Sequence, residues 1–109
     1  MKVIKRDGRL EEFTPDKIYN AVKAAYTQVF VEDHDKIEKV VKKVFYDIAD
    51  MDAEQIPITV IQAFVESRLI DVGYIKVAEK YIEYRLQRDI ERYGYGEQIV
   101  ASVNLGRIK

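Results

Sequence analysis

The chain has 109 residues, which suits one compact domain and leaves no room for a second. Its formal net charge of −1 argues against a general nucleic-acid-binding protein, because such proteins usually carry an excess of basic residues. It contains no cysteine, which excludes disulfides, zinc–thiolate sites and cysteine nucleophiles, and it shows neither a secretory signal nor an apolar run of about 20 residues. We therefore expect a cytoplasmic domain that does not enter a membrane.

The first predicted element is a β-hairpin at the N-terminus. Residues 2–5 (KVIK) and 10–13 (LEEF) are short β-prone runs on either side of the sequence RDGR. An Asp-Gly pair between two such runs predicts a type I′ turn, which needs positive φ at both central positions. The turn would carry Lys5, Arg6 and Arg9 on a short ribbon, where they could cover an anion or serve only solubility.

Two helices are expected next. Thr14 is the predicted N-cap of the first, with Pro15 at the first helical position and Asp16 where an acidic residue favours the helix dipole. Its apolar stripe consists of Ile18, Ala21, Val22, Ala25 and Val29. The second helix is expected over about 35–51, after a polar loop that contains His34, the only histidine.

The second half of the chain predicts one more strand and two more helices. Residues 54–58 (EQIPI) form a short extended piece that can add a third strand beside the hairpin. Thr59 is the expected cap of a third helix that Gly73 ends, and a fourth helix covers about 74–93. For residues 94–109, a linker, a tail and a short strand all stay open. The predicted fold class is α+β: a four-helix bundle covered by a small three-stranded β-sheet that includes the N-terminal hairpin.

Side chains that could perform catalysis are scarce. We interpret His34 as a solvent-exposed loop residue, since a base or metal ligand needs convergent partners. The serines, Ser67 and Ser102, have no histidine near in sequence, and most carboxylates alternate with lysine or arginine, as on a solvated helix face. No phosphate-binding loop motif is present, and Gly94-x-Gly96 follows a helix instead of linking a strand to one. We expect no enzyme activity and no metal site made of side chains.

Basic residues give the stronger signal. Three arginines lie on one stripe of the fourth predicted helix: Arg85, Arg88 and Arg92. Like charges along a stripe repel each other unless an anion lies between them, although Asp89, four residues after Arg85, could pair with it instead. Tyr81 and Tyr84 share part of this face, and we interpret them as residues at the edge of the core.

Three sequence blocks together resemble the ATP-cone family. They are V-x-K-R-D-G-R at 3–9, with E-x-F at 11–13 and D-K-I at 16–18; I-P-I-x-x-I-Q-x-x-V-E at 56–66; and A-x-x-Y-I-x-Y-R-x-x-R at 78–88. Members of this family are regulatory modules, found at the N-termini of ribonucleotide reductases, especially the anaerobic (class III) and class I types, and in a bacterial repressor of reductase genes. The resemblance implies an ATP-cone domain over 1–93 that binds ATP or dATP and acts by changing oligomeric state.

The resemblance also implies a set of nucleotide-binding residues. They are Val3, Lys5, Arg6, Gly8, Glu11, Thr14, Lys17, Ile58, Gln62, Arg85 and Arg88. The hairpin residues would close over base and phosphates, and Glu11 and Thr14 would contact the base or sugar. Ile58 and Gln62 would lie near the ribose and adenine, while Lys17 and the two arginines would hold phosphates. The basic members of this set carry five positive charges, which suits a triphosphate.

The expected function is therefore allosteric: binding of ATP or dATP, with Mg²⁺, controls a ribonucleotide reductase catalytic domain in cis or in trans through a nucleotide-dependent homo-oligomer. No membrane and no direct nucleic-acid contact are expected. Because the cone begins at Met1 and there is no cysteine for a zinc ribbon, we do not expect the repressor. An excised reductase domain and a free-standing cone both stay open. The alternative function is a cone-fold protein–protein interaction module that uses its basic hairpin on an acidic partner and binds no nucleotide.

Overall fold

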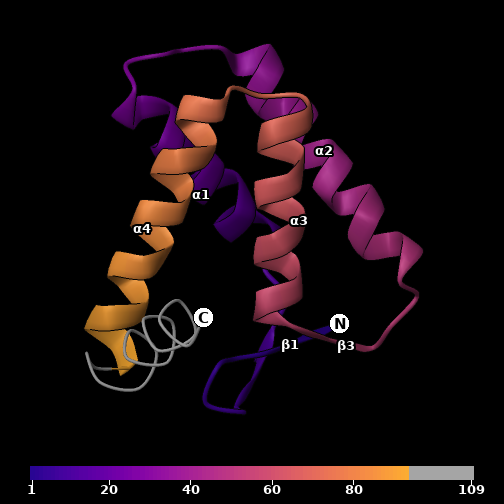
Figure 1. Ribbon diagram of the computed structural model, residues 1–109. Coiled ribbons are helices and arrows are strands. Elements are labelled where there is room, and N and C mark those ends of the chain that lie inside the picture. The colour runs from indigo at the N-terminus through magenta and orange to yellow at the C-terminus, as the bar shows by residue number, and fades with distance from the viewer. Residues whose placement is uncertain (94–109) are drawn as a thin grey trace, which may run out of the picture.

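A computed structural model shows how these segments fold, and it describes residues 1–93 (Figure 1). In chain order the elements are β1 (Lys2–Ile4), β2 (Leu10–Glu12), α1 (Pro15–Gln28), α2 (His34–Asp50), β3 (Gln55–Pro57), α3 (Ile58–Asp71) and α4 (Ile75–Tyr93). The predicted α+β class is confirmed. Residues 94–109, for which a linker and a strand were both left open, lie outside the described part of the chain.

The three strands form one mixed sheet with β1 in the middle, in the order β2-β1-β3. Val3 of β1 pairs with Glu11 in the antiparallel direction and with Ile56 in the parallel direction, so the segment 54–58 does join the hairpin. Val3 and Ile56 are buried against the helices. The sheet lies at one end of the bundle, and the α1–α2 and α3–α4 connections lie at the other (Figure 1).

The hairpin turn is not the type I′ turn expected from Asp-Gly. The Lys5 N–H donates to the Arg9 carbonyl at 2.8 Å, and the Gly8 N–H donates to the Lys5 carbonyl at 2.9 Å. Gly8 has φ of +89°, whereas Asp7 is not among the residues with positive φ. This pattern is that of a three-residue loop, in which one ordinary turn is followed by a glycine in the left-handed region. The pairing of Lys5 with Arg9 fixes the loop length, and the loop length selects the turn.

The helix starts agree only partly with the predicted caps. Thr14 precedes α1 with an extended backbone, but its side chain makes no cap hydrogen bond, and its hydroxyl donates to the Glu12 carbonyl instead. Asp33 caps α2 by accepting from the Lys36 N–H at 3.1 Å. The expectation that His34 lies in a loop is therefore wrong: it is the first residue of α2, with an exposed side chain.

The third helix begins earlier than predicted. Pro57, the last residue of β3, is also the residue before α3, so Thr59 lies inside the first turn and is not the cap. At the other end, Gly73 follows α3 for a steric reason. A Cβ there would lie 2.8 Å from the Leu69 carbonyl oxygen and 3.0 Å from the Tyr26 hydroxyl of α1. The absence of a side chain lets the α3–α4 connection approach α1.

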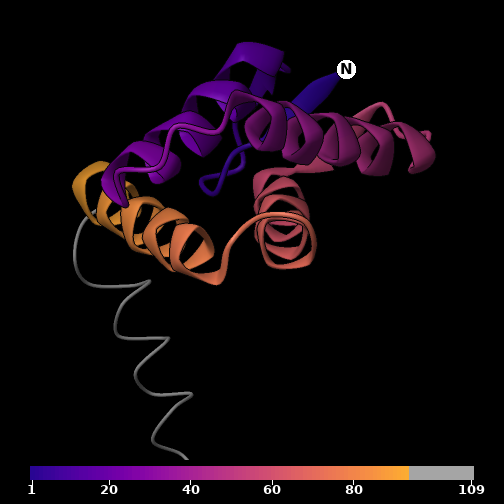
Figure 2. The same ribbon diagram turned by 90° about the horizontal axis from the view of Figure 1, so that it is seen from above.

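The four helices enclose one apolar core. Each helix packs against the next along the chain, and α1 also packs against α4. Seen from above, α1 and α2 form one layer and α3 and α4 a second (Figure 2). The fully buried side chains at the centre come from β3 and all four helices: Tyr26, Ile56, Leu69, Val22, Val40, Val44, Val65 and Val77. The cavity described next lies between the hairpin and the helices α1, α3 and α4.

Candidate functional site

A cavity of about 350 Å³ opens between the hairpin and the helices α1, α3 and α4. Seven of the expected nucleotide-binding residues line it: Lys5, Arg6, Lys17, Ile58, Gln62, Arg85 and Arg88. The structure therefore brings together side chains from four separate elements that the sequence could only assign one by one.

Four expected residues do not line the cavity. Val3 is buried in the sheet, with 7% of its surface exposed, and Gly8 forms the tip of the hairpin turn. Thr14 is exposed ahead of α1. Glu11 lies behind the wall, where it contacts two of the lysines that do line the cavity.

The cavity has walls of two kinds. Its apolar wall comes from α1 and α3: Ile18, Ala21, Ile58, Ile61 and Val65. Its second wall is formed by basic side chains: Lys5, Arg6, Lys17, Arg85, Arg88 and Arg92. An apolar wall suits a flat ring system, and clustered guanidinium and ammonium groups suit phosphates.

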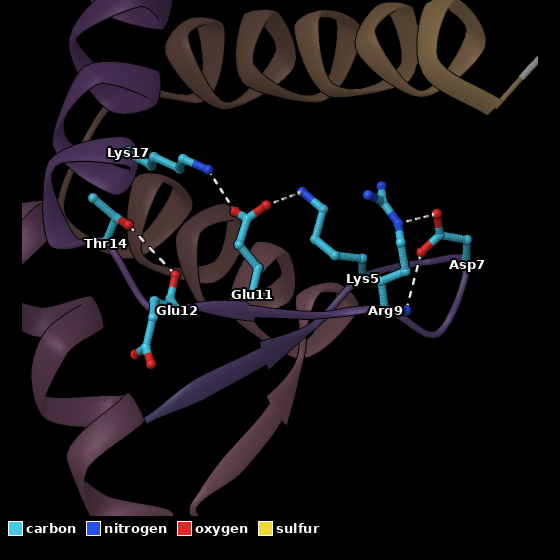
Figure 3. A network of polar contacts seen from close by, with 7 residues as sticks. All are labelled: Lys5, Asp7, Arg9, Glu11, Glu12, Thr14 and Lys17. Atoms are coloured by element: carbon cyan, nitrogen blue, oxygen red, sulfur yellow. Dashed lines mark hydrogen bonds and ion pairs between the residues drawn. The ribbon is translucent and has the colours of Figure 1, made fainter.

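Glu11 holds the two lysines on the hairpin side (Figure 3). The Lys17 ammonium donates to one of its oxygens at 2.5 Å, and the Lys5 ammonium lies 3.8 Å from the other. The hydrogen bond from Lys17 lowers the pKa of the Glu11 carboxyl. Burial lowers the pKa of the Lys5 ammonium, an effect that Glu11 opposes and that neighbouring positive charges reinforce. Lys5 is thus a half-buried cation whose one ion-pair partner among residues 1–93, Glu11, is shared with Lys17.

Arg85 and Arg6 are bound to side chains across the cavity. Arg85 donates from Nε and from a terminal nitrogen to the same oxygen of Glu66 on α3, at 3.0 and 2.6 Å. Arg6 donates to the Gln62 side-chain oxygen at 3.1 Å, and its Nε lies 3.0 Å from a carboxylate oxygen of Asp89 on α4. These contacts join the hairpin to α3 and α4.

Two arginines remain without a carboxylate partner among residues 1–93. Arg88 donates to the Tyr84 hydroxyl at 2.9 Å and lies 5.7 Å from the centre of that ring. Arg92 forms no ion pair with any residue that the structure describes. These two side chains are therefore the cations most available to an incoming anion.

Sequence reasoning missed part of the wall. It did not assign Asn20, one helical turn after Lys17, although the i, i+3 spacing put both on one face. It placed Tyr81 and Tyr84 at the edge of the core, and both also line the cavity. Asp89 was considered only as a partner of Arg85, because nothing in the spacing shows that the hairpin reaches α4.

Residues 1–93 contain neither a cluster of metal-binding side chains nor a membrane-spanning helix. No group of three metal-binding side chains is close enough together to hold a metal ion there. None of the four helices is both long and apolar enough to cross a membrane.

Comparison with known proteins gives the family. The model of the ATP cone domain matches residues 1–90. The anaerobic ribonucleoside-triphosphate reductase of Haemophilus influenzae is 39% identical over 90 residues, which cover 83% of this chain and 13% of the reductase. The transcriptional repressor NrdR of Desulforapulum autotrophicum is 38% identical over 86 residues, which cover 76% of this chain and 52% of the repressor. The chain therefore spans about an eighth of the one relative and about half of the other.

The repressors among the relatives change two expectations. Other NrdR proteins match at 31% and 28% identity, so the sequence-based exclusion of a repressor is not supported. A relative that represses transcription also argues against the expectation that this protein makes no contact with nucleic acid. The reductases and the repressors both match within the segment that this chain contains.

The segment that matches the family model, residues 1–90, is a regulatory domain and not an enzyme. It contains the sheet, most of α4 and every lining residue of the cavity except Arg92. Since the family model covers residues 1–90, the chain belongs to the ATP-cone family.

Proposed function

We propose that the domain binds ATP or dATP in the cavity and thereby controls ribonucleotide reduction. The observation that carries this proposal is the convergence of Lys5, Arg6, Lys17, Arg85 and Arg88 on one cavity that also has an apolar wall. Separate elements hold these cations near one another, an arrangement that suits an anion with several charges.

In this proposal the base lies against the apolar wall, near Ile58 and Ile61, with Gln62 as its polar neighbour. The phosphates lie toward α4 and the hairpin, where Arg88 and Arg92 receive them first. Val3, Gly8, Glu11 and Thr14, which do not line the cavity, stay predicted contacts that depend on the hairpin closing over the ligand.

Mg²⁺ fits this site as part of the nucleotide. Asp89 is the one carboxylate on the cavity wall, so residues 1–93 provide no cage of oxygen ligands. Mg²⁺ in nucleotide sites is commonly held by phosphates and water with few protein ligands. The ion would neutralise phosphate charge, while this chain's own residues orient the phosphates.

Binding would act as a switch because the cavity has contributions from the hairpin, α1, α3 and α4. A ligand that contacts all four fixes their relative positions and favours the arrangement that fits it best. The reductase relatives support an effect on a catalytic domain, in cis or in trans, and oligomeric state is the proposed means of that effect. The repressor relatives, of which the chain covers a larger share, support gene repression as a second candidate output.

Thermal unfolding with and without nucleotide tests the proposal. A ligand at one hundred times its dissociation constant stabilises the folded state by about 2.7 kcal/mol. For a domain of this size we expect Tm to rise by roughly 10 °C or more with saturating ATP or dATP and Mg²⁺. No rise with either nucleotide would instead support the alternative, an interaction module that has the cone fold and no nucleotide.

A further inference from the structure

Asp89 is an unusual residue for an anion-binding cavity, because it places a carboxylate on the cationic wall. It lines the cavity and is 8% exposed, the one charged residue of the described chain that is buried. A single oxygen of Asp89, Oδ2, lies 3.0 Å from Nε of Arg6 and 4.0 Å from a terminal nitrogen of Arg85. Asp89 therefore occupies the space between two arginines that a phosphate would otherwise occupy.

The contact between Arg6 and Asp89 is an ion pair without a hydrogen bond. Arg6 Nε and Asp89 Oδ2 are both buried, and neither has a hydrogen-bond partner in the part of the chain that the structure describes. A buried donor or acceptor without a partner is unfavourable. A phosphate oxygen that approaches along the Nε–H direction would form the bond that Asp89 does not form.

Neither arginine needs Asp89 to hold it in place. Glu66 accepts two hydrogen bonds from Arg85, and it does so from outside the cavity lining. Gln62 accepts a hydrogen bond from Arg6. With the guanidinium groups already oriented by these partners, the Asp89 carboxylate contributes mainly its negative charge.

We propose that Asp89 is an internal competitor of the ligand's phosphates, and that it raises the nucleotide concentration at which the domain responds. The inference rests on the proposed function, since it assigns a role at the same cavity. A phosphate that enters between Arg6 and Arg85 must displace the carboxylate or accept its repulsion. The resulting loss of affinity grows with the number of phosphates and is absent for a ligand that has none.

The test compares the parent with Asp89→Asn, which removes the charge and keeps the shape. Binding of ATP, of inorganic tripolyphosphate and of adenosine is measured by calorimetry at one fixed salt concentration. Asp89→Asn should bind ATP and tripolyphosphate about tenfold more tightly than the parent, a change of about 1.4 kcal/mol. Adenosine, which has no phosphate, should bind both proteins alike.

Two further variants separate charge from structure. Glu79→Gln removes a negative charge from an exposed position of the same helix, outside the cavity lining, and should leave all affinities within twofold of the parent. Asp89→Glu keeps the charge and should bind ATP no more tightly than the parent. Asp89→Ser serves as a second neutral variant in case the asparagine variant does not fold.

The outcomes are distinct. Unchanged or weaker ATP binding by Asp89→Asn, or failure of both neutral variants to fold, overturns the competitor role. If the parent binds no ATP but Asp89→Asn binds tripolyphosphate more tightly than the parent does, the nucleotide function fails and the competitor role stands. If no protein binds any of the three ligands, both proposals fail.

Discussion

At the residue scale, the cations of the cavity differ in what they must give up before they can bind an anion. Arg85 is bonded to Glu66, and Lys17 to Glu11, so each would exchange a carboxylate for a phosphate. Among residues 1–93, Arg88 has the Tyr84 hydroxyl and no carboxylate as its hydrogen-bond partner. An arginine with no carboxylate to replace should contribute most of its charge to the ligand.

Replacement of Arg88 by alanine should therefore weaken ATP binding by about 1.5–3 kcal/mol, the scale of a hydrogen bond to a charged group. The free energy of unfolding without ligand should hardly change, because Arg88 is exposed. Calorimetry and thermal unfolding measure the two quantities. The matched control is Lys42→Ala, which removes a positive charge from an exposed position of α2, a helix that does not line the cavity. Equal affinity of Arg88→Ala and the parent would contradict the assignment of phosphates to α4.

Residues could be predicted from the sequence where local spacing or a family motif marks them. Arg85, Arg88 and Arg92 follow from helical spacing, and all three line the cavity. The partners of these residues could not be predicted in the same way. Glu66 and Asp89 meet their arginines through the packing of α3, α4 and the hairpin, and no sequence interval encodes a contact between separate elements.

At the element scale, the hairpin is a short support for two of the cations. Each of its strands has three residues, and Asp7 ties the turn by accepting from the Arg9 N–H at 3.1 Å. Gly8 provides the positive φ that lets the chain reverse in three residues. The placement of Lys5 and Arg6 in the cavity therefore depends on the conformation of one glycine.

The Gly8→Ala variant should lose about 1–2 kcal/mol of stability, because φ of +89° is unfavourable for a residue with a Cβ. A clash is not the cause, since a Cβ there would meet nothing within 4 Å. ATP affinity should fall as well, because a distorted turn moves Arg6. Gly8→Asn should lose less stability and less ATP affinity than Gly8→Ala, since asparagine enters the left-handed region more readily than alanine. If the alanine and asparagine variants behaved alike, backbone strain would not be the reason for the glycine.

A second pair of elements, α2 and α3, is joined by an ion pair outside the cavity lining. Arg68 donates to the two carboxylate oxygens of Asp47 at 2.8 and 2.7 Å. Hydrogen bonding from Arg68 lowers the pKa of Asp47 from its ordinary value of 3.8. A carboxyl with a lowered pKa in the folded state stabilises the fold above its unfolded pKa, and that contribution is lost as the pH falls through the folded pKa.

The Asp47→Asn variant should accordingly be less stable than the parent at pH 7, by about 1 kcal/mol. The difference in the free energy of unfolding between the variant and the parent should shrink as the pH falls below the ordinary pKa of Asp47. Urea unfolding at pH 7 and at pH 3 measures it. Glu38→Gln, at an exposed position of α2, provides the comparison and should show a smaller difference at pH 7. A difference that persists undiminished at pH 3 would mean that packing, and not charge, makes Asp47 important.

Elements were predicted well where a periodic apolar pattern marked them, and less well at their junctions. The four helices and the parallel strand follow from such patterns and from Pro57. The cap of α3 was misplaced because Thr59 has the chemistry of a cap, but the chain passes from β3 into α3 with no loop between them. Pairing of β3 with β1 decides where the helix begins, and this pairing is a tertiary contact.

At the scale of the whole molecule, the cavity and the surfaces available to a partner are separate. Three exposed large apolar residues lie in or next to the α1–α2 and α3–α4 connections: Phe30, Ile70 and Ile75. These connections lie at the end of the bundle opposite the sheet (Figure 1). A ligand that changes the angle between helices at the sheet end would also move the surfaces at the other end. Such a change alters oligomeric state only if the two nucleotides make different contacts.

ATP and dATP should therefore favour different assemblies, with dATP promoting the larger one. The two nucleotides differ by a 2′-hydroxyl, and a hydroxyl left without a partner costs on the order of 1–3 kcal/mol. Ile58 and Gln62 are the residues expected beside the sugar. Light scattering with each nucleotide at saturation gives the mass of each form. Identical masses for the free, ATP-bound and dATP-bound forms would show that this chain binds without assembling.

The parallel pairing of β1 with β3 also bears on how the chain folds. Lys2 pairs with Gln55, so both α1 and α2 lie in the loop that this pairing closes. Closing a long loop costs more entropy than closing a short one, so we expect the parallel pairing of β1 with β3 to form late in folding. The cavity takes Arg6 from the hairpin and Arg88 from α4, so we expect it to be complete only once these separate elements have packed together. A ligand that recognises the finished cavity has nothing to bind in the folding transition state. It would therefore slow the unfolding rate and leave the refolding rate nearly unchanged.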